Sequence, residues 1–232
     1  MNHQPSSPVE QAYLRAIATG ASMTRRQEMV AEAARVHRPE YTRLVDDFVK
    51  RLETVRAGHS TPGVGDHLPS FTLPDQDGRF VKLEDLLGSD PVVVAFHRGH
   101  WCPYCRLNMI GLSEVAEHVA PARIVTISTE TQRYTKALRD MASADFPFLT
   151  DVSAGYALQL GLAIWIDPGL AQLIASVGWD VPSYQGGTDW IMPMPSVFVL
   201  DREGIIRARH IDRDYRRRMD MDELVAAVRA VD

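Results

Sequence analysis

Residues 96–105 read FHRGHWCPYC and contain the only two cysteines of this 232-residue chain. The stretch continues from PVVVAFH at 91–97, an apolar run typical of a buried central strand. After it, residues 104–119 carry apolar side chains at helical spacing. Pro103 suits the first position of a helix, because the N–H that proline lacks would have no partner there. The sequence therefore predicts the two cysteines at the end of a buried strand and the start of a helix.

This placement favours redox chemistry. Cys102 would lie at the helix N-terminus, where free N–H groups and the helix dipole stabilise a thiolate. Cys105 follows one turn later on the same face, so it can attack a mixed disulfide formed at Cys102. Arg98 and Arg106 add positive charge, and Trp101 would limit the access of water. We expect Cys102 to be the solvent-facing, attacking thiol with a lowered pKa, and Cys105 to resolve the product.

Three other interpretations of the pair stay open. His97 and His100 extend it to the pattern HxxHxCxxC, which offers four possible zinc ligands. His97, however, belongs to the strand and should point away from a pair on the helix. A purely structural disulfide would close a very short loop and remove little unfolded-state entropy. Two inert buried thiols are the remaining alternative. We favour the redox pair and expect neither a bound metal nor a tightly bound cofactor.

The chain divides into three parts. Residues 1–58 are predicted to be helical, 59–66 form a linker rich in glycine and proline, and 67–232 form an α/β unit. The apolar stripe between Tyr41 and Val55 needs a surface to cover, because an isolated helix of that length is marginal in water. We expect it to pack on the α/β unit or on a second copy of the chain, which makes a homodimer through these helices plausible.

Within the second part, short apolar runs alternate with amphipathic stretches. Residues 70–83 predict two strands around Asp77-Gly78, and 196–211 predict two strands around an Arg-Glu-Gly turn. A buried strand at 123–129 and a helix at 131–143 lie between them. This order predicts a central mixed sheet flanked by helices.

Composition narrows the classes of partner. The formal net charge is −5, so electrostatics favour neither a nucleic acid nor an anionic membrane as partner. The N-terminus lacks the basic and apolar regions of a secretory signal, and the longest uncharged stretch, 152–166, is too short to span a bilayer. We expect a cytoplasmic protein.

Three segments together resemble a known family. They are VGDHLPSFTLPDQDGRFVKLEDLLG at 64–88, WCPYC at 101–105 and MPSVFVLDREGII at 194–206. They are similar to the thioredoxin superfamily, and most of all to peroxiredoxin-like members of the alkyl hydroperoxide reductase/thiol-specific antioxidant family. The resemblance covers about 64–230. It implies a thioredoxin-like fold, with the helical N-terminal part as an extension.

The resemblance also assigns a role to Pro195. In that superfamily a cis-proline opens the strand that faces the dithiol, and Pro195 matches its position. The cis bond would turn the preceding backbone toward the cysteines, where it can pair with an extended substrate. Typical peroxiredoxins have their active-site arginine at about the same place.

The chain departs from the usual peroxiredoxin pattern Pro-x-x-x-Thr/Ser-x-x-Cys. Counted back from Cys102, the Thr/Ser and Pro positions hold Gly99 and Ala95. Counted back from Cys105, they hold Cys102 and Arg98. The groups that polarise a peroxide are thus absent from their expected places.

The sequence therefore predicts an antioxidant-type oxidoreductase that performs thiol–disulfide exchange through Cys102 and Cys105. Trp101, Pro103, Arg98 and Pro195 are the expected supporting residues. Reduction of hydroperoxides by the same cysteines is the alternative, and a redox-sensing or metal-binding interaction module is the second. The expected partners are a disulfide, thiol or hydroperoxide substrate and an external dithiol or glutathione as reductant.

Two further groups are expected to be structural. The run RDYRRRM at 213–219 is interpreted as a solvated basic patch rather than a site for an anion or a protein. Trp165, Trp179 and Trp190 lie in 161–194, a region without a clear pattern, and are expected to pack in the interior rather than over the dithiol.

Overall fold

The structure is a computed structural model that describes residues 7–231. Its centre is a five-stranded mixed sheet in the order β5 (Phe148–Thr150), β4 (Arg123–Ser128), β3 (Val92–Phe96), β8 (Ser196–Leu200) and β9 (Ile206–Ile211). β3 pairs in parallel with β4 and antiparallel with β8. Every residue of β3 is buried, as expected for a β-branched run with both faces covered.

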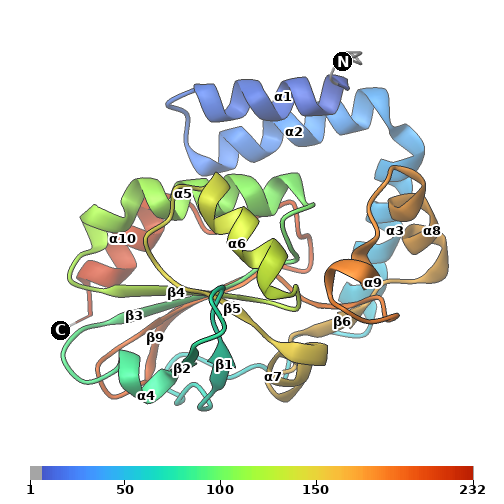
Figure 1. The fold of residues 1–232 in the computed structure, drawn as a ribbon. Coiled ribbons are helices and arrows are strands. Elements are labelled where there is room, and N and C mark those ends of the chain that lie inside the picture. Colours follow the sequence, from blue (N-terminus) through green and yellow to red (C-terminus); the bar gives the residue numbers. More distant parts are fainter. Residues whose placement is uncertain (1–6, 232) are drawn as a thin grey trace.

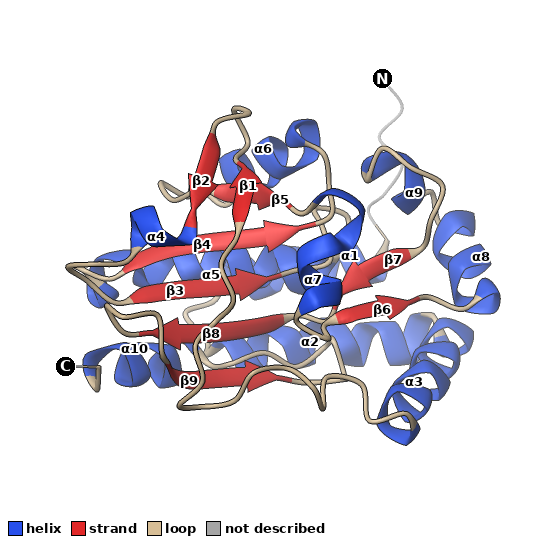
Figure 2. Cartoon of the chain, turned by 90° about the horizontal axis from the view of Figure 1, so that it is seen from below, coloured by secondary structure: helices blue, strands red, loops and turns tan. Residues whose placement is uncertain are grey.

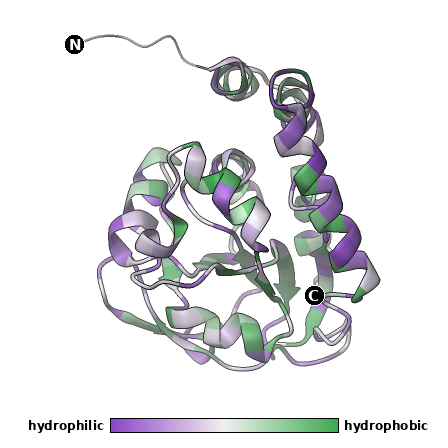
Figure 3. Cartoon of the chain, turned by 90° about the vertical axis from the view of Figure 1, so that its right-hand side faces the viewer, coloured by the Kyte–Doolittle hydropathy of each residue, from purple (hydrophilic) through white to green (hydrophobic). Residues whose placement is uncertain are grey.

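Helices cover both faces of this sheet (Figure 1). One face carries α5 (Pro103–Val119), α6 (Gln132–Met141) and α10 (Met221–Arg229), and the other carries α4 (Leu83–Leu86) and α7 (Gly155–Gln159). Figure 3 shows the central strands as hydrophobic and the surrounding helices as mixed. The predicted thioredoxin-like sheet with flanking helices is confirmed.

Smaller elements surround the sheet (Figure 2). The predicted hairpin at 70–83 is β1 (Thr72–Pro74) and β2 (Phe80–Lys82). The unpatterned region 161–194 contains a second hairpin, β6 (Ala163–Trp165) with β7 (Ile191–Pro193), and between them α8 (Pro168–Ser176) and α9 (Val181–Tyr184). A short 3-10 turn, Val152–Ala154, precedes α7. Among the described helices, none combines the length and the apolar character that a membrane crossing requires.

Three helices form the N-terminal part: α1 (Pro8–Ala18), α2 (Met23–His37) and α3 (Pro39–Thr54). The α1 helix begins with Ser7 as its N-cap, accepting a hydrogen bond from the Glu10 N–H at 3.2 Å. The middle of the predicted stripe is buried in α3, with Phe48 only 3% exposed, which stabilises the fold by about 1.5–3 kcal/mol for that side chain. Val55, at the end of the stripe, follows the helix and is 71% exposed. Of the two surfaces predicted for the stripe, the structure places it on the same chain. A homodimer through these helices stays a prediction.

The α1–α2 pair lies across α5 (Figure 1). Gly111 permits this approach, because a Cβ at that position would collide with the end of the Met23 side chain. Arg26, buried in α2, donates two hydrogen bonds to the carboxylate of Glu114 on α5, at 2.8 and 2.9 Å. The expected linker at 59–66 runs beside β9, where the Arg209 side chain donates hydrogen bonds to the carbonyls of Thr61 and Pro62. The domain boundary there stays a prediction.

Candidate active site

The two cysteines lie where the sequence predicts, at the junction of β3 and α5. Cys102 is the N-cap of α5, Pro103 occupies its first turn and Cys105 follows within it. Both sulfurs are free thiols. Both residues are buried, however, with 1% of Cys102 and none of Cys105 exposed. The expectation that Cys102 faces solvent is wrong, because side chains from distant parts of the chain cover it.

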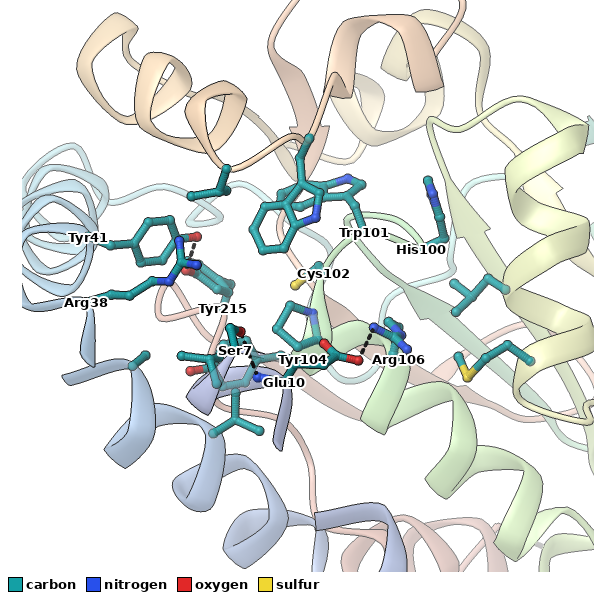
Figure 4. Close-up of a pocket in the computed structure, with 18 of the residues that line it drawn as sticks. Ser7, Glu10, Arg38, Tyr41, His100, Trp101, Cys102, Tyr104, Arg106 and Tyr215 are labelled. Atoms are coloured by element: carbon teal, nitrogen blue, oxygen red, sulfur yellow. Dashed lines mark hydrogen bonds and ion pairs between the residues drawn. The ribbon is translucent and has the colours of Figure 1, made fainter. Parts of the chain in front are cut away.

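Cys102 lines a partly open cavity of about 470 Å³ (Figure 4). Its walls are mainly apolar and aromatic, and more than a third of the lining residues come from the N-terminal part of the chain. The α1–α3 region contributes Ser7, Val9, Glu10, Val30, Ala34, Arg38 and Tyr41. Because the N-terminal helices wall the space above Cys102, they are part of the candidate site.

Trp179 closes the cavity from the loop between α8 and α9. Its ring lies 5.4 Å from that of Trp101, centroid to centroid, and both rings line the cavity with Cys102. Trp179 packs against the core as expected, but it also lines the cavity with Cys102, which the sequence does not predict. Trp165, by contrast, is 65% exposed and is not a core residue. The sequence pattern of this region gives no signal for either placement.

The Cys105 sulfur is the one that receives hydrogen bonds. The backbone N–H of Arg98 donates to Cys105 Sγ at 3.3 Å, and Arg218 Nη2 donates to it at 3.5 Å. Arg218 is only 7% exposed. The interpretation of 213–219 as a solvated patch is wrong for this arginine, because the loop folds back over α5 and turns one of its guanidinium groups toward the dithiol.

The shared proton of the pair follows from these contacts. Burial raises the pKa of Cys105, but the hydrogen bond with Cys102 and the charges of Arg218 and Arg98 outweigh it and lower that pKa well below its usual value. Burial and the same hydrogen bond raise the pKa of Cys102. These directions favour a thiolate on Cys105 beside a thiol on Cys102. They run against the predicted fall in the pKa of Cys102, because burial opposes a charge on that sulfur.

Arg98 is a completely buried cation beside the dithiol. Its guanidinium lies 3.8 Å from the ring of Tyr215 and 4.7 Å from the ring of Trp101, and Nε donates to Met192 Sδ at 3.2 Å. Burial acts to lower the pKa of Arg98, but the negative charge that Cys102 and its tyrosine neighbours can carry raises it, so the group stays charged. Among the described residues, its Nη1 and Nη2 have no hydrogen-bond partner.

Two tyrosines hold this guanidinium in place. Tyr215 packs against it, and the Tyr215 hydroxyl is 3.3 Å from that of Tyr41 on α3. Both tyrosines line the cavity. Neither has a sequence signal, since they lie 174 positions apart and on either side of the segments that carry the family resemblance.

The two histidines of the stretch separate in the structure. His97 is buried and its pKa falls to about 4, chiefly because burial disfavours the charge. The His100 ring contacts the rings of Tyr134 and Tyr184, which also contact each other, and its Nδ1 is 2.6 Å from the buried carboxylate of Glu130. His100 is therefore engaged by a carboxylate. Within residues 7–231, no three His, Cys, Asp or Glu side chains meet as a metal site.

Pro195 does not have the expected geometry. Within the described residues the one cis peptide bond precedes Pro121, so the Met194–Pro195 bond is trans. The Met194 N–H donates to the Leu162 carbonyl at 2.8 Å, which extends the β6–β7 hairpin. The backbone N–H before Pro195 is thus already hydrogen-bonded within the chain, and Pro195 does not line the cavity. The expected pairing of this backbone with a substrate is wrong.

These contacts give a testable ionisation. Titration of thiolate absorbance should show one transition below the value of about 8.5 of a free cysteine, and it should vanish in Cys105→Ser. Arg218→Gln should raise the pKa of that transition, because a cation that stabilises the thiolate is lost. Arg217→Gln, whose side chain is 73% exposed, is the matched control and should leave it in place. An unchanged titration in Arg218→Gln would contradict the assignment.

Comparisons with known proteins agree with this geometry. Residues 64–209 match the sequence model of the AhpC/TSA family. A Mycobacterium tuberculosis protein named "Putative peroxiredoxin" is 32% identical over 100 residues, which is 42% of this chain and 65% of that relative. Peroxiredoxin Bcp of Escherichia coli is 27% identical over 155 residues, 66% of this chain and 86% of that relative.

A solved structure supports the same placement. The crystal structure of peroxidoxin BcpB from Mycobacterium tuberculosis superposes with a TM-score of 0.57 and 25% identity, covering 75% of this chain and 99% of that one. The family match covers the sheet, the dithiol and the β8–β9 hairpin, and it excludes α1–α3. The chain therefore belongs to the AhpC/TSA family.

Proposed function

We propose that this protein is a thiol peroxidase that reduces hydroperoxides by oxidising Cys102 and Cys105 to a disulfide. The observation that carries the proposal is the buried guanidinium of Arg98, whose two Nη atoms have no partner among the described residues. Arg98 is not itself part of the cavity lining, but its guanidinium packs on Trp101 and Tyr215, which line the cavity with Cys102. A buried donor without a partner is costly, so its retention favours a ligand that accepts those hydrogen bonds. A peroxide is such an acceptor.

Arg98 answers the objection raised by the sequence. The threonine and arginine of typical peroxiredoxins are absent from their expected positions, which counts against peroxide activation. Arg98 supplies a cation from the β3–α5 junction instead, and Arg218 supplies a second from the other side of the dithiol. Donors fixed in a dry site stabilise charge that develops on the leaving oxygen without reorganising.

The proposed reaction balances as follows. The Cys102 thiol passes its proton to the Cys105 thiolate and attacks the terminal oxygen of ROOH, so the O–O bond breaks and RO⁻ leaves, taking the proton from Cys105 to become ROH. Cys102 is then a sulfenic acid and Cys105 is again a thiolate. Cys105 attacks the Cys102 sulfur, the S–O bond breaks, and the departing hydroxide takes a proton from solvent and leaves as water, forming the Cys102–Cys105 disulfide. One hydroperoxide thus oxidises two thiols.

This proposal reorders the two functions predicted from the sequence. Thiol–disulfide exchange with a protein substrate needs a sulfur that the partner can touch, whereas both sulfurs are buried. A small hydroperoxide fits the cavity, so peroxide reduction takes precedence and exchange is kept for the step that resets the enzyme. We place this activity in the cytoplasm, as the sequence predicts.

Single-turnover oxidation tests the proposal. Fully reduced protein, mixed with one equivalent of hydrogen peroxide or an alkyl hydroperoxide in the absence of any reductant, should consume the peroxide and lose both thiols. Intact-mass spectrometry should then find the protein lighter by two hydrogens, with no added oxygen. Peroxide that persists beside two intact thiols would overturn the proposal and leave thiol–disulfide exchange as the better assignment.

A further inference from the structure

The disulfide formed in each cycle must be reduced at the bottom of a walled cavity. Cys102 is reached through the cavity, and Cys105 is not part of its lining. The walls are fastened to the rest of the chain: Arg216 pairs with Asp46 of α3 at 2.7 Å, and Arg51 of α3 pairs with Asp167. The walls restrict the approach of a protein thiol to Cys102, which is only 1% exposed. A small thiol is less restricted.

The cavity is also lined by two arginine side chains among its mainly apolar residues. Arg38, on the α2–α3 junction, lines it and has no side-chain hydrogen bond or ion pair with any described residue. Arg106 of α5 lines it as well, with its guanidinium 4.1 Å from the Tyr13 ring and 3.8 Å from the Glu10 carboxylate. In Figure 4, Arg38 and Arg106 lie on opposite sides of Cys102.

We propose that the reductant is a low-molecular-weight thiol that carries two carboxylates and one ammonium group and binds inside this cavity. Its carboxylates pair with Arg38 and Arg106, and its ammonium lies toward Glu10, which matches the two cations and one anion of the lining. A cavity of about 470 Å³ accommodates a molecule of tripeptide size. The inference rests on the proposed function only in requiring the Cys102–Cys105 disulfide.

The two sulfurs fit this reduction chemically. The bound thiol, as thiolate, attacks Cys102 Sγ, the disulfide bond breaks and Cys105 leaves as a thiolate. That leaving group is the sulfur to which Arg218 and the Arg98 backbone N–H donate, and a stabilised thiolate leaves faster. A second molecule of the same thiol attacks the mixed disulfide on the sulfur of the first. Cys102 is released and takes up a proton, and the two small molecules leave as their own disulfide.

Reduction of the pre-formed disulfide tests the proposal separately from peroxide chemistry. The protein is oxidised with diamide, so the result does not depend on peroxidase activity. The second-order rate of its reduction is then measured with glutathione, glutathione monoethyl ester, 2-mercaptoethanol, and thioredoxin with its reductase. After correction for thiolate fraction, glutathione should be faster than its ester and than 2-mercaptoethanol, and thioredoxin should be the slowest.

Variants identify the binding groups. Arg38→Gln should slow reduction by glutathione about tenfold, the effect of losing one hydrogen bond to a charged group, and leave the 2-mercaptoethanol rate unchanged. Arg35→Gln, an exposed arginine of the same helix, is the matched control and should change neither rate. Equal rates for glutathione and its ester, an equal slowing of both small thiols in Arg38→Gln, or fastest reduction by thioredoxin would each overturn the proposal.

Discussion

Cys102→Ser should abolish hydroperoxide consumption, because the thiol that lines the cavity is then missing and Cys105 is not part of the lining. Cys105→Ser should still react once and then stall with a sulfenic acid on Cys102, since no second thiol is present to expel water. Both substitutions replace a sulfur by a slightly smaller oxygen inside the core, so the folded fraction of each variant is measured first, by near-ultraviolet circular dichroism.

Intact-mass spectrometry after one pulse of peroxide separates the two variants. Cys105→Ser should gain one oxygen atom or, if a dimedone probe is present, one dimedone adduct. Cys102→Ser should gain neither. Oxygen found on Cys105 in Cys102→Ser, together with none in the reciprocal variant, would reverse the roles of the two cysteines. Undiminished peroxide turnover in both variants would remove the dithiol mechanism.

Arg98→Gln should slow the oxidation of Cys102 by peroxide by two to three orders of magnitude, about the effect of losing a charged donor aimed at developing negative charge. The backbone N–H of residue 98 survives the substitution, so Cys105 keeps that hydrogen bond. Stopped-flow tryptophan fluorescence or quenched mass analysis measures the rate. Arg98→Lys, which keeps a buried cation without the planar fork, should recover part of it.

Arg202→Gln, at an exposed position in the β8–β9 turn, is the control for loss of an arginine elsewhere. A purely structural Arg98 would change thermal stability and both half-reactions together. Our assignment instead requires that oxidation by peroxide slows far more than reduction of the disulfide by 2-mercaptoethanol. Equal slowing of the two half-reactions in a folded Arg98→Gln protein would contradict it.

The local features of the fold were predictable because local rules set them. The run before the cysteines is β-branched and apolar, so it is a central strand, and Pro103 begins a helix because its missing N–H costs nothing there. The same rules predict the turn at Asp77-Gly78. Each of these needs only a few neighbouring residues.

The surroundings of the dithiol were not predictable in this way, because they depend on contacts between distant segments. Arg218 reaches Cys105 across 113 positions, and its sequence context of three arginines is typical of an exposed patch. Trp179 comes from a region with no periodic pattern. The helix-terminus argument for Cys102 considered only its own helix, whereas the loop that carries Arg218 decides which sulfur holds the charge.

The reactive groups and many of the residues that line the cavity come from different parts of the sequence. The two sulfurs and Arg98 lie within 64–209, the segment that matches the family model. Seven of the residues that line the cavity lie between Ser7 and Tyr41, outside that segment. Substitutions at the lining positions of α1 and α2 would therefore alter which molecules enter, whereas Tyr41, which contacts Tyr215 beside Arg98, would have to be kept. Such a layout lets selection or an engineer retune preference without risking the reactive centre.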